Sequence, residues 1–133
     1  MMSTTTPALR VMRILSVLVL LATGGIHLFL VFDGVGGILG VLFVLNAVAA
    51  LVLAMGMALL RGRLLQGATV LSLLFLIATL GALLLALTVG LFGITEVWTF
   101  TLVPQTIVVE SIGIVLLAVT TVLVRRSGSP SRR

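Results

Sequence analysis

Four long apolar segments constrain this chain more than any other feature of its sequence. They cover residues of about 11–32, 36–60, 64–91 and 104–124, and each reaches the roughly 20 residues that an α-helix needs to cross a hydrocarbon core of about 30 Å. Of the 133 residues 61% are hydrophobic and the mean hydropathy is +1.44, which is more apolar surface than a water-soluble domain of this length can bury. The sequence therefore predicts an all-α integral membrane bundle of four transmembrane helices.

The two ends of the chain differ from the expected transmembrane domain at 10–126. Residues 1–9 are polar and residues 127–133 are polar and basic, so both are predicted to be flexible cytoplasmic tails. A cleaved signal peptide is the competing interpretation of the start, because arginines precede an apolar run with small residues near 22–24. That run continues to Phe32, however, beyond the point where cleavage would fall.

The eight basic residues are all arginines, and most of them mark the ends of the apolar segments. Those that act as topology signals are Arg10, Arg13, Arg61, Arg63, Arg125 and Arg126. The other two connections carry only Asp33 and Glu96, so the positive-inside rule places both termini in the cytoplasm. We expect the arginines to contact anionic lipid headgroups and no nucleic acid, since they are not interleaved with aromatic residues. The preference for arginine over lysine is typical of a high-GC bacterial genome, which makes the bacterial cytoplasmic membrane the expected location.

Small residues predict where the helices pack. They recur near the start of the second segment and at four-residue spacing in the third, and they are Gly36, Gly40, Ala78, Ala82, Ala86 and Gly90. Such residues let helix backbones approach closely in lipid. The connection at 92–103 contains Trp98, which we interpret as an interfacial anchor. A lid over a binding cavity is the alternative for that connection.

Four polar residues within the apolar segments are predicted to share one depth. Counted from the nearest arginine at about 1.5 Å per residue, all of them lie roughly 21 to 24 Å from the cytoplasmic face, and they are His27, Asn46, Thr79 and Glu110. Helical spacing joins two of them to polar or small neighbours, in the inward-facing stripes Ser16, Thr23, His27 and Thr106, Glu110, Gly113, Leu117, Thr120. A layer of candidate polar residues therefore meets inside the bundle.

Two functions are compatible with this layer. A buried, protonated Glu110 can fasten one helix to another, which suits a non-enzymatic accessory or structural subunit that packs with itself or with a larger membrane partner. Alternatively, Glu110 and His27 can exchange a proton in a proton-coupled small-solute transporter or channel subunit, with Asn46 and Thr79 orienting them. The sequence favours the first function.

The sequence gives little support to an enzymatic function. The chain has one histidine and no cysteine, so it cannot supply the three or four ligands of a metal centre. A haem held by His27, alone or paired across a homodimer, is the only cofactor arrangement that remains formally open. The phosphate-binding and nucleophile motifs of common enzymes are absent from the sequence. We therefore expect no catalytic residues, metal or cofactor.

The first hairpin carries a resemblance to known proteins. The stretch Gly24–Leu28, the following glycine turn and the stretch Leu42–Ala47 resemble groups of small four-helix bacterial membrane proteins. Small multidrug exporters share the size and helix number, but their essential carboxylate belongs to the first helix, whereas here it is Glu110 in the last. The two hairpins also align with each other at a few positions, which either duplication or chance explains.

Overall fold

The computed structural model describes residues 6–128, and these form four helices. Their bounds are α1 Pro7–Phe32, α2 Gly37–Leu59, α3 Gly62–Thr88 and α4 Val103–Ser127. Each helix is long and apolar enough to cross a membrane, so the prediction of an all-α bundle with four spans is confirmed. The chain is a multi-pass membrane protein. Most of the two predicted tails, residues 1–5 and 129–133, lies outside the described residues.

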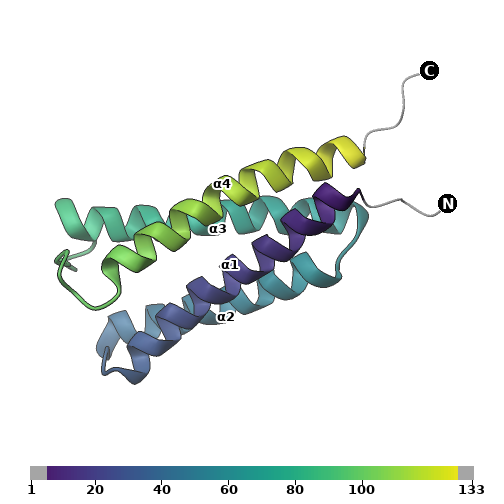
Figure 1. Cartoon of the computed structure of the whole chain (residues 1–133). Helices are drawn as coiled ribbons and strands as arrows, with labels where there is room; N and C mark the ends of the chain where they lie inside the picture. Colours follow the sequence, from purple (N-terminus) through teal and green to yellow (C-terminus); the bar gives the residue numbers. More distant parts are fainter. Residues whose placement is uncertain (1–5, 129–133) are drawn as a thin grey trace, which may run out of the picture.

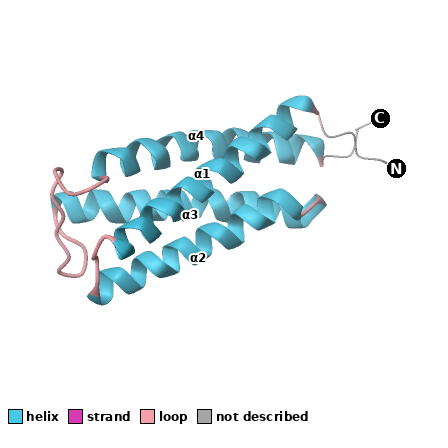
Figure 2. Cartoon of the chain, turned by 60° about the horizontal axis from the view of Figure 1, so that its bottom comes forward, coloured by secondary structure: helices cyan, strands magenta, loops and turns pink. Residues whose placement is uncertain are grey.

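The helices run up and down in one bundle. Figure 1 shows the start of α1 and the end of α4 at one end, which we call the terminal end. The α1–α2 turn and the longer α3–α4 connection lie at the opposite end, the loop end, where they are seen together in Figure 2. The helix α1 packs extensively on α2 and α4, and α3 packs on α4, whereas α2 and α3 make the least extensive contact of the neighbouring pairs.

Several helix ends differ by a few residues from the predicted bounds, and two of these differences have a local reason. The helix α1 begins at Pro7 and not near residue 11, because the Thr6 hydroxyl accepts a hydrogen bond from the Leu9 N–H at 3.2 Å and caps the first turn. The helix α3 ends at Thr88, because the N–H of Gly90 turns back to the Leu85 carbonyl at 2.8 Å with φ at +85°. Gly90 therefore lies beyond α3 and outside the expected packing stripe. The helix α4 continues to Ser127, a few residues beyond the expected end.

An apolar core fills the terminal end and the middle of the bundle. Its buried members come from all four helices: Leu9, Leu20, Ala54, Met57, Leu65, Ala68, Leu76, Leu117 and Val124. Arg13 closes this end, since its guanidinium donates to the carbonyls of Met57, at 3.0 and 2.8 Å, and Leu60, at 3.0 Å. The last carbonyls of a helix have no partner within it, so one arginine of α1 caps the end of α2.

The two polar stripes expected to face inward are buried, which confirms that prediction. Thr23 Oγ1 is buried without a partner among the described residues, whereas Ser16 and Thr120 each donate to the carbonyl four residues earlier, at 2.7 Å. Their two side-chain oxygens are also 3.2 Å apart, which joins α1 to α4. Where no water is present, a hydroxyl in a helix can donate its hydrogen bond to a backbone carbonyl of the same helix.

The closest helix contacts are made at glycines other than those predicted to be helix-packing residues. A Cβ on Gly113 would come within 2.3 Å of Val19 and 2.5 Å of Leu76, so α4 meets α1 and α3 at this position. Gly24 similarly faces Ala50 of α2 at 3.0 Å. Of the predicted pair, Gly40 packs against the Val35 carbonyl of the turn, whereas Gly36 is the N-terminal cap of α2 and has open space around it.

Candidate functional site

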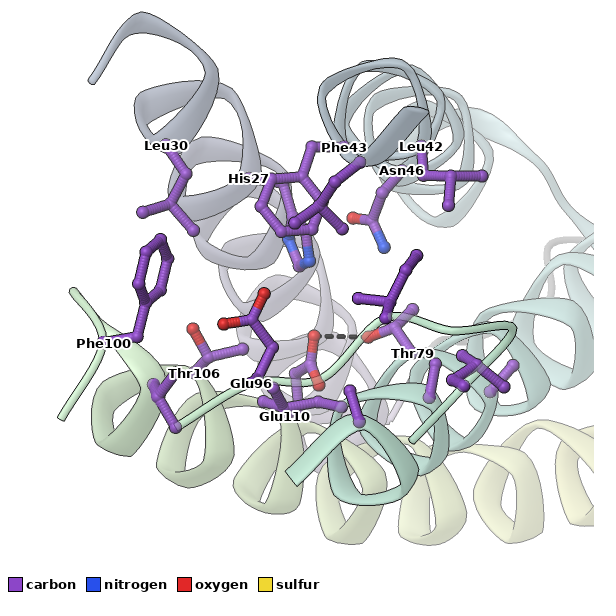
Figure 3. Close-up of a pocket in the computed structure, with 18 of the residues that line it drawn as sticks. His27, Leu30, Leu42, Phe43, Asn46, Thr79, Glu96, Phe100, Thr106 and Glu110 are labelled. Atoms are coloured by element: carbon purple, nitrogen blue, oxygen red, sulfur yellow. Dashed lines mark hydrogen bonds between the residues drawn. The ribbon is translucent and has the colours of Figure 1, made fainter. Parts of the chain in front are cut away.

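A cavity of about 440 Å³ lies inside the bundle toward the loop end. All four helices and the α3–α4 connection line it, and apolar side chains dominate its walls. The polar side chains in the lining are His27, Asn46, Thr79, Glu96, Thr101, Thr106 and Glu110. The structure thus brings the four residues of the predicted polar layer together around one space (Figure 3).

Glu110 is the most enclosed of these groups. Its side chain is fully buried, with 0% exposure, on the inward stripe of α4. One carboxylate oxygen, Oε1, accepts a hydrogen bond from the Thr79 hydroxyl of α3. The other oxygen, Oε2, is buried and has no partner among the described residues. A buried carboxylate with one unmet acceptor is costly in an apolar interior, and such groups in membrane proteins are functional candidates.

His27 faces the same space from α1 and is held in one orientation. Its Nδ1 atom lies 2.8 Å from the Thr23 carbonyl oxygen. A carbonyl only accepts, so Nδ1 carries the proton in this contact and the neutral ring presents Nε2 as an acceptor. The ring also meets Phe43 of α2 edge to face, with centroids 4.9 Å apart and planes at 89°. These two contacts fix the imidazole beside the cavity.

Asn46 completes the polar layer from α2. Its Oδ1 atom is buried and has no hydrogen-bond partner within residues 6–128. The oxygen and nitrogen of an amide exchange places when the group flips, so Asn46 can offer the cavity a donor or an acceptor. The site therefore contains a polar side-chain atom without a hydrogen-bond partner on α2, in Asn46, as well as on α4, in Glu110.

Glu96 lines the cavity and was not predicted from the sequence as a site residue. Its backbone N–H donates to the Ala86 carbonyl at 2.9 Å, which ties the α3–α4 connection to α3. In Figure 3 its carboxylate extends toward the space shared by His27 and Glu110. Partial burial raises the pKa of the Glu96 carboxyl above its usual value. Its only sequence signal is that it is one of three acids in the chain.

The alanines of α3 that were predicted to pack against a helix line the cavity. Ala78, Ala82 and Ala86 of α3 all contribute to its wall. Trp98 is 56% exposed on the connection and is not part of the lining, in keeping with an outward position. Small side chains on α3 therefore make room for the cavity.

Some of the residues of α2 and α3 that line the cavity are also exposed. Leu42 of α2 lines it and yet is 47% exposed, and Ala78 of α3 is likewise exposed. This is the helix pair with the least extensive contact. Phe92, at the start of the connection, lines the cavity and is 97% exposed, so the lining also extends to the loop end.

What the arrangement can do chemically follows from its donors and acceptors. The described part of the chain holds no group of three or more histidine, cysteine or acidic side chains placed to bind a metal ion. The site instead combines one imidazole and two carboxyls with an apolar wall, which suits hydrogen bonding and proton exchange with a small molecule. Comparison with protein-family models, with curated proteins and with solved structures finds no match to this chain.

Proposed function

We propose that this protein binds a small, largely apolar molecule in the cavity at the loop end, and that Glu110 and His27 provide its polar contact and a site of proton exchange. This is the chemistry of a proton-coupled small-solute transporter or channel subunit. We further propose that the protein lies in a bacterial cytoplasmic membrane and is related to small four-helix bacterial membrane proteins.

One observation carries the proposal: a fully buried carboxylate, with one oxygen unpartnered among the described residues, lines a cavity of about 440 Å³. Cavities of this size are typical of small-molecule sites, which are mostly apolar with a few placed polar groups. A carboxyl that only fastened two helices would be expected in a filled interface, because protein interiors are close-packed. The cavity is what favours a binding role over a packing role.

Filling the cavity tests this function. Ala82→Phe adds an aromatic ring to the cavity wall, and Val48→Phe adds the same ring at a position 54% exposed on α2. Each protein is purified in mild detergent, its fold is checked by circular dichroism, and its small molecules are extracted and measured by mass spectrometry. We expect a molecule that is present with the wild type and Val48→Phe and depleted with Ala82→Phe. Equal contents in all three proteins would contradict the proposal.

The accessory role remains a second candidate because of the outer face of α1. Ala22 and Gly25 are both exposed there, and a Cβ on Gly25 would meet nothing within 4 Å. Small residues on the face of a transmembrane helix permit another helix to approach. A second copy or a larger membrane partner would then pack on this face, and disulfide formation by Gly25→Cys in native membranes would reveal a homodimer.

A further inference from the structure

The side chains around the cavity are unequal in what they offer a ligand. Thr79 already donates its hydroxyl to Glu110, and Thr106 donates to the Leu102 carbonyl at 2.7 Å. The Nδ1 proton of His27 is likewise committed to Thr23. The hydrogens of these three groups are therefore not available to a bound molecule.

Residues of the same lining carry acceptors that have no protein partner. Glu110 Oε2 and Asn46 Oδ1 have no partner in residues 6–128, although both atoms are enclosed by the surrounding protein, and the neutral His27 ring presents Nε2. Glu96 adds a second carboxyl from the connection. When both carboxyls are ionised, the side-chain donors left in the described lining are the Asn46 amide and the hydroxyl of Thr101, which is exposed. A ligand that carries hydrogen-bond donors would therefore pair with these acceptors.

The charge of the lining points the same way. Two of its residues are acidic, and no arginine from the described chain contributes to it. Burial in an apolar space disfavours the ionised form of a carboxyl, and a cation bound beside it favours that form. Phe43 and Phe100 also line the cavity, and aromatic faces attract cations that have left water.

From these observations we infer that the cavity selects a lipophilic amine, a compact apolar body that carries one protonated nitrogen. Glu110 receives the ammonium group, Glu96 faces it from the α3–α4 connection, and the alanines of α3 contact the apolar body. The inference rests on the proposed binding function and names its ligand class. An anionic or purely apolar ligand would leave these acceptors unpaired.

Three probes with one apolar body and different head groups test the inference: 4-phenylbutylamine, 4-phenylbutanol and 4-phenylbutyrate. Their binding to the detergent-solubilised protein at pH 7 is measured by titration calorimetry. We expect the amine to bind about tenfold more tightly than the alcohol, because charge-assisted hydrogen bonds exceed neutral ones, and the carboxylate to bind more weakly than either. Ala82→Phe should weaken binding of the amine and the alcohol alike.

The isosteric variants Glu110→Gln and Glu96→Gln identify the source of the preference. Glu110→Gln keeps an acceptor for Thr79, so it should fold and bind the alcohol while losing the preference for the amine. Glu96→Gln should reduce the same preference by a smaller factor. Equal affinity for amine and alcohol in the wild type, with both weakened by Ala82→Phe, would overturn the amine class and leave the binding function standing. Absence of binding by all three probes would overturn both.

Discussion

At the scale of single residues, the hydrogen bond from Thr79 to Glu110 joins α3 to α4 inside the cavity wall. Thr79→Val removes the donor and leaves both carboxylate oxygens without a protein partner. Loss of a partner to a buried polar group costs about 1–3 kcal/mol, so we expect that decrease in the free energy of unfolding in detergent. The matched control is Thr121→Val, since Thr121 donates only to the Leu117 carbonyl of its own helix. Similar losses in the two variants would contradict the assigned role of Thr79.

Glu96 gives a pH dependence of known sign. Burial raises its pKa in the folded protein, so the folded state binds this proton more tightly than the unfolded chain does. The resulting stability is present at low pH and is lost as the pH rises through the raised pKa. We expect the melting temperature of the wild type to fall relative to Glu96→Gln over that range. Parallel melting curves of the two proteins from pH 4 upward would contradict this expectation.

The sequence could predict the polar layer because every helix rises by the same amount per residue, so counting from an arginine gives a depth. His27, Asn46, Thr79 and Glu110 do line one cavity. The position of Glu96 could not be predicted in this way, because Glu96 lies in a connection between helices, where the chain has no fixed rise per residue. The alanines of α3 were interpreted as packing residues because small side chains serve a close contact and a cavity wall equally well.

At the scale of the helices, the position of closest approach is Gly113 of α4. A Cβ there would lie 2.3 Å from Val19 and 2.5 Å from Leu76. We expect Gly113→Ala to destabilise the protein by about 1–3 kcal/mol, because extra volume in a packed interface forces its neighbours to move. Gly25→Ala is the control. A Cβ at that position meets no other atom within 4 Å, so this variant should be as stable as the wild type or slightly more stable. The measurement is reversible unfolding in mixed micelles, and equal stability of the two variants would contradict this packing.

Helix ends were less predictable from the sequence than the helices themselves. The apolar runs located all four spans, but the start of α1 is set by the Thr6 cap and the end of α3 by the backbone turn at Gly90. The cap that Arg13 gives to α2 is a tertiary contact between residues more than forty positions apart. From the distribution of charges along the sequence, Arg13 is predicted only as a topology signal.

At the scale of the whole molecule, the arginine distribution predicts that both termini are cytoplasmic. Asp33→Cys, in the α1–α2 turn, and Ser127→Cys, at the end of α4, are at opposite ends of the bundle. They also avoid glycines with positive φ, such as Gly34 and Gly62, where a cysteine would be strained. In intact cells we expect a membrane-impermeant thiol reagent to label only Asp33→Cys. Labelling of Ser127→Cys alone would reverse the topology.

The sequence raised a binding cavity only as an alternative for the connection at 92–103 and could not predict where the cavity lies. Its existence depends on how far α2 and α3 separate at the loop end and on how the α3–α4 connection folds over them, neither of which follows from hydropathy. The sequence favoured an accessory role because a buried glutamate and histidine are equally compatible with a sealed contact. The space around Glu110 is what shifts the preference to a binding function.

Because the chain has no cysteine, a single introduced thiol reports directly on whether that space can be reached. Ala82→Cys lies in the cavity wall, and Ala54→Cys lies in the apolar core, where Ala54 is 2% exposed. Both proteins are treated in membranes with a small uncharged methanethiosulfonate, and modification is followed by mass spectrometry. The binding function predicts that Ala82→Cys is modified much faster than Ala54→Cys and that 4-phenylbutanol slows the reaction. Equal protection of the two thiols would show a sealed interior and contradict it.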